Sequence, residues 1–360
     1  MRQCIARHVL TLLLSLGSLA PSAWAYREYF TPEQKAKLER IQTVLVEAIA
    51  LTDKGGAGSG PFTETVARRL GEMGYTVVLD AAKAHDVVFH VKCEQRKTWE
   101  GTTAAGGDAD LPDSPSRLWK GPACQLTYVL GGMKIKWQKE VRTDFEDAVA
   151  AAGAAQAPEP GAYAMATLRE ALEKYDFPLL LAAEWGQPDR LLKALDSSDT
   201  SQARKIKIMS LLGEMQADEA LPKLKEALKD RDLVKQALVA MGNLGKDGIP
   251  LLIDIMNSSP HPEVQAAAAK GLGQIGGLHG DASVVLPLLA KLQDPKTDWA
   301  VLTEVAWALG KIPDKRSIQP LYDLDKKLQA IRDPDNVTLK KLKEAVFWAI
   351  KQCDTWDQYS

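Results

Sequence analysis

The sequence predicts two domains, a small N-terminal α+β sandwich (an antiparallel sheet with helices) followed by an all-α superhelical solenoid. Segments in which apolar and polar residues alternate, as they do in strands, lie in the first half of the chain. From Phe177 onward, helix-forming segments follow one another with short turns. A short apolar motif also recurs there at the period of stacked helix pairs.

The first 25 residues have the three regions of a secretory signal peptide. Arg2 and Arg7 form the basic region, residues 9–20 are apolar, and Ala23-Trp24-Ala25 is a small-residue exit. The apolar run is shorter than the roughly 20 residues that span a bilayer. Because Tyr26, not a cysteine, follows the expected cut, lipid anchoring is disfavoured. We therefore expect cleavage after Ala25 and a periplasmic or secreted protein.

The charge balance limits the class of partner. The formal net charge is −2, and removal of a leader that contains Arg2 and Arg7 makes it −4. Without a basic excess the chain has no electrostatic footprint for nucleic acid or for an anionic membrane. We expect a protein partner, with no nucleic acid and no membrane insertion.

The α+β domain is expected over residues 26–176. Residues 87–93 alternate, with Cys93 on the apolar face, and residues 124–130 alternate in the same way from Cys124. Gly131-Gly132 then predicts a hairpin turn to a third strand. In the order of its elements this half resembles the small α+β domains of bacterial envelope proteins.

Two segments of this domain are rich in small and turn-forming residues. Residues 98–122 are predicted to be a long loop, and residues 148–160 a linker before a closing helix. Cys93 and Cys124 flank the loop and share a strand face, so an oxidising compartment predicts a disulfide between them. The third cysteine of the expected mature chain, Cys353, is predicted to be a buried thiol.

The repeat motif is clearest in residues 304–313, where an apolar helix end leads to Gly310 and a turn. We therefore expect residues 177–353 to form helix pairs, with residues 177–186 as the first helix and residues 354–360 as a tail. The equivalent glycine positions are separated by 29, 31, 37 and 41 residues, and they are Gly213, Gly242, Gly273, Gly310 and Lys351.

Positions counted back from each glycine define the expected core. Residues one and five positions before it are apolar or alanine, and those two positions before are mostly small, which lets neighbouring helices approach closely. The glycine itself suits a helix C-terminus. Proline marks the start of the first helix in most pairs, at Pro222, Pro250, Pro287 and Pro320.

These repeats resemble the HEAT-like repeats of the phycobilin-lyase type, whose units have an acidic turn, a Val-Arg pair and an Ala-Leu-Gly ending. Asp230-Arg231-Asp232-Leu233-Val234-Lys235 with Met241-Gly242 matches well, as does Pro262-Glu263-Val264-Gln265 with Leu272-Gly273. Lys or Gln replaces the usual arginine. The resemblance implies a solenoid fold, but for function it allows lyases, adaptors and scaffolds alike.

No catalytic constellation emerges from the sequence. The glycine-rich residues 55–60 lie where a phosphate loop would lie, but the lysine and hydroxyl residues of such a loop do not follow. His85, Asp86, His90 and Cys93 are close together, yet on a strand His90 points away from Cys93. We expect no enzyme activity, no cofactor and no metal.

The residues three positions before each glycine are predicted to face away from the core. At 100° per residue this column lies about 160° from the column one position before the glycine. Its two tryptophans predict an anchor for a partner, unless residues 353–360 fold back and bury Trp348. The predicted partner-binding residues are Trp307, Trp348, Lys270 and Val239, and Ser210 completes the column.

The sequence thus predicts an extracytoplasmic scaffold or adaptor that mediates protein–protein interaction in the cell envelope. Two alternatives remain open. The repeat resemblance favours a lyase-like or bilin-handling enzyme. Trp99, Trp119 and Trp137, near the predicted loop, favour a cell-wall or polysaccharide binder.

Overall fold

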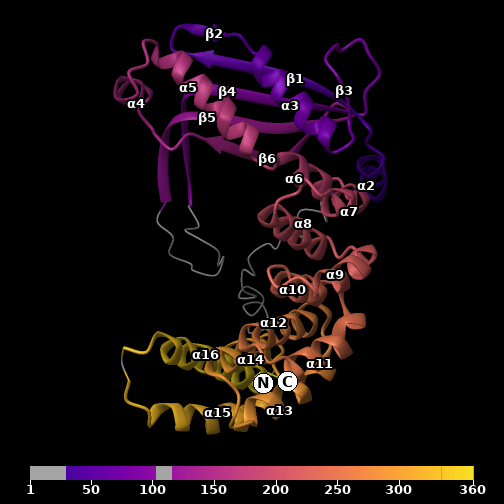
Figure 1. Cartoon of the computed structure of the whole chain (residues 1–360), viewed down its shortest axis with the longest axis vertical. Helices are drawn as coiled ribbons and strands as arrows, with labels where there is room; N and C mark the ends of the chain where they lie inside the picture. The colour runs from indigo at the N-terminus through magenta and orange to yellow at the C-terminus, as the bar shows by residue number, and fades with distance from the viewer. Residues whose placement is uncertain (1–29, 103–115, 334, 360) are drawn as a thin grey trace, which may run out of the picture. The chain divides into compact units, whose positions relative to one another are not determined.

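The structure is a computed structural model that describes residues 30–102, 116–333 and 335–359. The predicted signal peptide, residues 1–25, lies outside these ranges. The chain forms two compact units (Figure 1). The first contains residues up to Lys37, Thr43–Arg68 and Val77–Tyr175. The second contains Asp176–Ser360 and two short segments of the N-terminal half, Leu38–Gln42 and Arg69–Thr76.

The first unit is built on one sheet with strand order β2-β1-β4-β5-β6, and β3 pairs with β1. β1 and β4 run parallel, whereas β1–β2, β4–β5 and β5–β6 are antiparallel. α5 packs against β1, β4, β5 and β6. The strands are β1 (Thr43–Thr52), β2 (Gly55–Ala57), β3 (Thr76–Val78), β4 (Val87–Thr102), β5 (Ser116–Leu130) and β6 (Met133–Arg142). The helices of this half are α2 (Pro32–Glu39), α3 (Gly60–Glu72), α4 (Ala148–Ala154) and α5 (Pro160–Lys174).

The alternation of residues 87–93 and 124–130 predicts both the buried face and the pairing of β4 with β5. The two strands pair so that their apolar residues lie opposite one another on the same face, and each of these side chains is at most 4% exposed. The pairs are Val87–Leu130, Phe89–Tyr128, Val91–Leu126 and Cys93–Cys124. The last pair is joined by the predicted disulfide.

The expected loop over residues 98–122 is wrong at both ends. β4 continues to Thr102 and β5 begins at Ser116, with pairing resumed from Lys97–Gly121 to Thr102–Ser116 after an irregularity. Residues 103–115 lie outside the described ranges. A ladder is held by backbone hydrogen bonds, so it tolerates a composition that lacks apolar alternation.

The expected linker over residues 148–160 is also wrong, because its first half is the helix α4. Asp147 caps this helix by accepting hydrogen bonds from the backbone N–H groups of Val149 and Ala150, at 2.8 and 3.1 Å. Alanine has the highest helix propensity of the residues. An alanine-rich stretch behind an N-cap aspartate therefore predicts a helix better than a linker.

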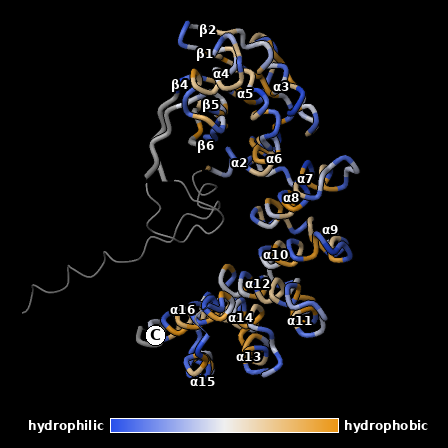
Figure 2. The backbone as a smooth tube through the Cα atoms, turned by 60° about the vertical axis from the view of Figure 1, so that its left-hand side comes forward, coloured by the Kyte–Doolittle hydropathy of each residue, from blue (hydrophilic) through white to orange (hydrophobic). Residues whose placement is uncertain are grey.

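The second unit is an all-α solenoid. Residues 177–184 form α6, whose Leu179, Leu181 and Ala182 are fully buried, so the predicted first helix packs as part of the helical array. The later helices carry both hydrophilic and hydrophobic positions, as the colours of Figure 2 show. The first helices of the pairs are α7 (Pro188–Asp196), α9 (Leu221–Ala227), α11 (Ile249–Ser258), α13 (Val285–Gln293) and α15 (Lys315–Gln329). The second helices are α8 (Gln202–Glu214), α10 (Val234–Leu244), α12 (Pro262–His279), α14 (Trp299–Lys311) and α16 (Val337–Tyr359).

The periodicity predicts the solenoid core correctly. Residues one and five positions before each glycine position are at most 7% exposed in all five second helices. Short 3₁₀ turns precede α9, α11 and α13, at Asp218–Ala220, Lys246–Gly248 and Ala282–Val284. Pro222 and Pro250 lie at helix starts, but Pro320 lies inside α15, which begins at Lys315.

The expectation that each repeat glycine lies at a helix C-terminus is correct for Gly213 and Gly310, the penultimate residues of α8 and α14, but wrong for Gly273, which lies well inside α12. Gly242 and Gly273 have helical residues of α10 and α12 on both sides. A Cβ on Gly242 would lie 2.4 Å from the carbonyl oxygen of Gly271, and one on Gly273 would lie 2.6 Å from the Cβ of Ala308. Backbone contact between neighbouring second helices therefore requires these glycines. The contacts repeat as Gly213–Ala240, Gly242–Gly271, Gly273–Ala308 and Gly310–Ala349.

The same contact explains why the last repeat lacks a glycine. The residue four positions before the glycine is fully buried in the four earlier second helices. Its equivalent in α16, Phe347, is 58% exposed. Lys351 occupies the glycine position, with its Nζ 4.5 Å from the Phe347 ring centroid. Within the described residues no further helix packs against this face of α16. The Lys351 side chain therefore does not clash with the backbone of a following helix.

The expected tail over residues 354–360 is wrong, because α16 continues to Tyr359. The Tyr322 hydroxyl of α15 donates to Asp354 Oδ2 at 2.6 Å, and the Thr355 hydroxyl donates to the carbonyl of Lys351. No proline or glycine interrupts the helix after Cys353. The chain therefore does not fold back at Cys353.

Gln187, at the start of α7, holds the two N-terminal segments of the second unit. Its side chain is 6% exposed. Its Nε2 lies 3.1, 3.2 and 2.9 Å from the carbonyl oxygens of Leu38, Glu39 and Ile41 and donates to them. Its Oε1 accepts a hydrogen bond from the Tyr75 hydroxyl at 2.8 Å. One amide thus joins α7 to two segments more than 100 residues away.

Arg190 completes this cap one turn further along α7. Its Nε donates to Gln187 Oε1 at 2.8 Å, and one terminal nitrogen donates to the Met73 carbonyl at 2.7 Å. The guanidinium lies 3.9 Å from the centroid of the Tyr75 ring, which packs edge-on against Trp185. Burial raises the pKa of Tyr75, and the nearby Arg190 charge opposes this. The hydroxyl therefore remains a donor at neutral pH.

Gly242→Ala should destabilise the solenoid. Alanine normally favours a helix by about 1 kcal/mol over glycine, but here its Cβ would meet the Gly271 backbone. We expect overpacking to lower the free energy of unfolding by about 1 to 3 kcal/mol, measured by urea unfolding. In the control Gly71→Ala, the new Cβ meets no atom within 4 Å, and stability should hold or rise. Equal stability of both variants would contradict the helix contact.

Gln187→Ala should remove the cap, because the carbonyl groups of Leu38, Glu39 and Ile41 lose their shared donor, and two of these hydrogen bonds are buried. We expect a loss of about 2 to 4 kcal/mol in the free energy of unfolding. Gln319→Ala is the control, since its amide bonds the exposed Asp323 at 2.8 Å, and it should change stability by less than about 0.5 kcal/mol. Similar losses in the two variants would show that the cap contributes little.

Candidate interaction surface

The outer column consists of the residues three positions before each glycine position, on five neighbouring second helices. Lys270 is exposed and the other members are half-buried, so none is a fully buried core residue. α8, α10, α12, α14 and α16 pack in sequence, which makes the column continuous (Figure 1). Its members are Ser210, Val239, Lys270, Trp307 and Trp348.

The structure brings Trp307 and Trp348 into direct contact. Their ring centroids are 4.9 Å apart, and the rings are tilted by 48°. Both rings are half-buried and pack against the solenoid core. A Cβ on Gly310 would lie 2.3 Å from Cζ3 of Trp348, so this ring occupies the space above the glycine. The pair is therefore fixed in place while part of each indole stays accessible.

The outer column changes character along the solenoid. At α8 it is polar, because Gln236 Nε2 donates to the Ser210 hydroxyl oxygen at 2.9 Å. Val239 and Lys270 follow on α10 and α12. Among the four residues predicted to bind a partner, Trp307 and Trp348 form a ring contact. Their binding role stays a prediction.

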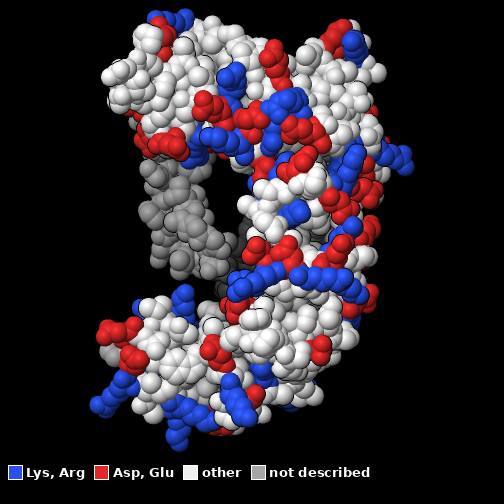
Figure 3. Space-filling view, in the orientation of Figure 1, with Lys and Arg blue, Asp and Glu red and all other residues white. Residues whose placement is uncertain are grey.

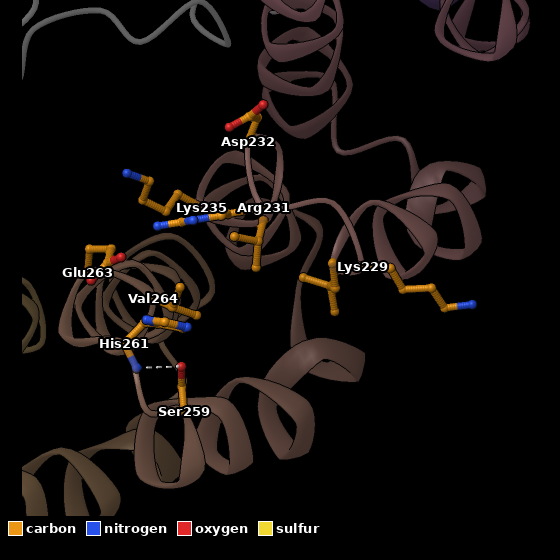
Figure 4. A pocket seen from close by; sticks show the side chains of 10 residues that line it. Lys229, Arg231, Asp232, Lys235, Ser259, His261, Glu263 and Val264 are labelled. Carbon is orange, nitrogen blue, oxygen red and sulfur yellow. Dashed lines mark hydrogen bonds between the residues drawn. The ribbon is translucent and has the colours of Figure 1, made fainter.

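A second concave feature, which we call the turn pocket, lies where α10 and α12 begin (Figure 4). It has a volume of about 520 Å³ and is formed by the α9–α10 and α11–α12 turns. In the sequence these two turns stand out only as repeat motifs. Arg231 and Lys235 inside an otherwise acidic turn were the signal that could have marked the pocket. Its lining residues are Leu228, Lys229, Arg231, Asp232, Val234, Lys235, Ser259, His261, Glu263 and Val264.

The other sequence candidates do not form a site in the described residues. His90 pairs with Glu47 at 3.1 Å on the face of the sheet opposite Cys93. No group of three or more His, Cys, Asp or Glu side chains suited to a metal occurs in residues 30–102, 116–333 and 335–359. Trp137 is 5% exposed and packs against Phe89 and Tyr128, so it offers no face to a sugar. The side chains of Trp99 and Trp119 are not among those that the structure describes.

Cys353 is fully buried, its Sγ lies 3.9 Å from the Leu309 carbonyl oxygen, and burial raises its pKa. A buried thiol that stays protonated is a poor nucleophile. None of the helices in the described part of the chain is long and apolar enough to cross a membrane.

Comparison with protein families matches HEAT repeats in two overlapping segments, residues 188–273 and 249–334. These segments contain α7 to α15 and thus most of the outer column and the whole turn pocket. A search of the curated proteins found no match. HEAT repeats are generally non-catalytic and indicate an interaction scaffold with protein partners. The C-terminal half of this chain therefore consists of HEAT-like repeats.

Proposed function

We propose that this protein is an extracytoplasmic scaffold or adaptor that binds a protein partner of the cell envelope, without catalysis. The observation that carries the proposal is the Trp307–Trp348 pair, held in contact on the outer column of the HEAT repeats. Aromatic side chains are enriched among the few residues that dominate binding energy in protein interfaces. The pair supplies such an anchor in a rigid setting.

Rigidity matters because a partner does not then have to order the two side chains. Each indole has one side against the solenoid core, and Trp348 also lies over Gly310. An anchor that is already fixed loses little conformational entropy when it binds. The half-buried state of the pair therefore supports binding, because it combines accessible aromatic area with a fixed geometry.

The proposed location outside the cytoplasm rests on the signal-peptide pattern of residues 1–25 and on the cysteines. Cys93 and Cys124 are bonded at opposing positions of β4 and β5, and both are fully buried. Disulfides persist in oxidising compartments and are rare in the cytosol. The disulfide and the leader therefore favour the same compartment, a periplasmic or extracellular one.

Loss of the tryptophan pair should abolish partner binding. Wild-type protein first captures its partner from a native envelope extract. We expect this partner to bind Trp307→Ala about 30-fold more weakly than wild type, which corresponds to a loss of about 2 kcal/mol of binding free energy. Trp307→Ala with Trp348→Ala should bind more weakly still. Isothermal titration with the purified partner measures both values, at a temperature where circular dichroism shows the variants folded.

Trp299→Ala is the matched control. Trp299 is also a half-buried tryptophan of α14 that packs against the core, but it lies at the other end of the helix. Its loss should lower the melting temperature about as much as Trp307→Ala and leave affinity unchanged. If both variants weaken binding equally, the pair acts through stability and is not the anchor.

Processing and oxidation test the location. Protein isolated from its native cells should begin at Tyr26, and peptide mapping without reductant should recover Cys93 joined to Cys124. Cys353 should resist alkylation until the protein is unfolded, because it is buried. Recovery of Met1 in the folded protein, or of Cys93 and Cys124 as free thiols, would place the protein in the cytoplasm.

A further inference from the structure

The turn pocket has an apolar floor beneath a charged rim. Leu228, Val234 and Val264 form the floor and pack against the solenoid core. All three are half-buried, so part of each side chain faces the pocket. Its volume of about 520 Å³ is within the range of pockets that hold small ligands or a few residues of a peptide.

Two cations point the same way at the rim. Arg231 and Lys235 both line the pocket and are exposed, and their side chains extend in the same direction in the view of Figure 4. Neither forms a hydrogen bond or an ion pair with any residue that the structure describes. Figure 3 shows Lys and Arg side chains gathered in a band at the level of α9 and α10. An anion at this rim would thus meet charges that are not already neutralised.

The carboxylate of Asp230, which directly precedes Arg231, is already engaged in hydrogen bonds. Asp230 accepts hydrogen bonds from the backbone N–H of Asp232 at 2.8 Å and from Gln202 Nε2 at 3.0 Å. The Gln202 hydrogen bond is the largest cause that lowers the pKa of Asp230. Asp230 therefore stabilises the turn and does not pair with Arg231.

The opposite wall is rigid and carries hydrogen-bond acceptors. Ser259 Oγ accepts from the backbone N–H of His261 at 3.3 Å, and Gln265 Nε2 donates to the Ser259 carbonyl at 2.6 Å. Asp232 and Glu263 complete the rim, and their carboxylates make no bond to a described side chain. Two carboxylates at the rim repel a polyanion, but they accept hydrogen bonds from peptide N–H groups.

We propose that the turn pocket binds an acidic segment of a partner protein. The segment places carboxylates on Arg231 and Lys235 and an apolar side chain on the floor of Leu228, Val234 and Val264. Its backbone N–H groups face Asp232 and Glu263. A nucleic-acid backbone offers phosphates without N–H donors or apolar side chains, and it does not fit this combination.

The pocket is continuous with the outer column on α10. Lys235 and Val239 are four residues apart on this helix, which places them on the same face. Lys270 of the outer column lies on α12, whose first turn lines the pocket through Glu263 and Val264. The inference rests on the proposed function, because the same partner spans the pocket and the column.

The probe is a fluorescein-labelled peptide with one glutamate on each side of a central leucine, titrated into the full chain and followed by anisotropy. We expect binding that weakens as salt rises. Arg231→Ala with Lys235→Ala should weaken it at least about tenfold. A peptide with serine in place of leucine should bind more weakly, because the apolar floor is then left empty.

Lys229→Ala is the matched control for charge. Lys229 belongs to the same turn, but its ammonium group points away from the pocket in Figure 4. This variant should bind the peptide within about twofold of wild type, whereas general attraction to basic residues would weaken it as much as Lys235→Ala. Arg231→Lys should keep most of the affinity, since the charge is retained.

Three results would overturn the proposal: no binding of the peptide, equal loss in Lys229→Ala and Lys235→Ala, or displacement of the peptide by an equal concentration of inorganic phosphate. Trp307→Ala should bind the peptide normally. If the peptide does not bind but partner binding still depends on the two tryptophans, the pocket proposal is rejected and the proposed function stands. If the peptide binds but partner capture does not depend on the tryptophans, the tryptophan anchor is rejected and the pocket proposal stands.

Discussion

Backbone contact between neighbouring second helices is the constraint on which the solenoid depends. A side chain at Gly242 or Gly273 would overlap atoms of the next helix, so these positions accept no Cβ without movement. Neighbouring second helices therefore approach one another at the glycines. The residues on either side of each glycine contact are thereby held against the same residues of the next helix. Trp348 is placed over Gly310 by this spacing, and its ring meets Trp307 at 4.9 Å for the same reason.

The fold of the second half follows from the sequence because its core repeats with the helical period. Apolar residues one and five positions before each glycine share one side of a helix, and all of them are buried. The role of the glycine did not follow in the same way. A glycine near a helix end suits both a C-cap and a close helix contact, and only the position of the neighbouring helix distinguishes the two.

The first half shows a similar limit. Alternation predicted the buried face of β4 and β5 and the Cys93–Cys124 pair, because side chains alternate between the faces of a strand. Residues 98–102 and 116–122 lack that pattern, yet they pair through the backbone. Gln187 was missed for another reason. Its carbonyl partners lie 146 to 149 residues away, and no local pattern signals such contacts.

For the candidate site, helix geometry predicted which residues form the outer column. The structure adds the contact between the two tryptophan rings and the turn pocket. The two tryptophans lie at the α14–α16 end of the column, and the turn pocket lies at the start of α10 and α12. One region offers aromatic area with little charge, and the other offers cations over an apolar floor. A partner that uses both would need an apolar anchor and an acidic segment on a single surface.

The most direct measurement of this account is hydrogen exchange of the full chain with and without its captured partner. If the HEAT repeats are the binding surface, the partner should slow exchange in α14 and α16 around Trp307 and Trp348, and in the turns that begin α10 and α12. Protection confined to the sheet of the first unit, with the second helices unchanged, would contradict the claim that the HEAT repeats are the binding surface.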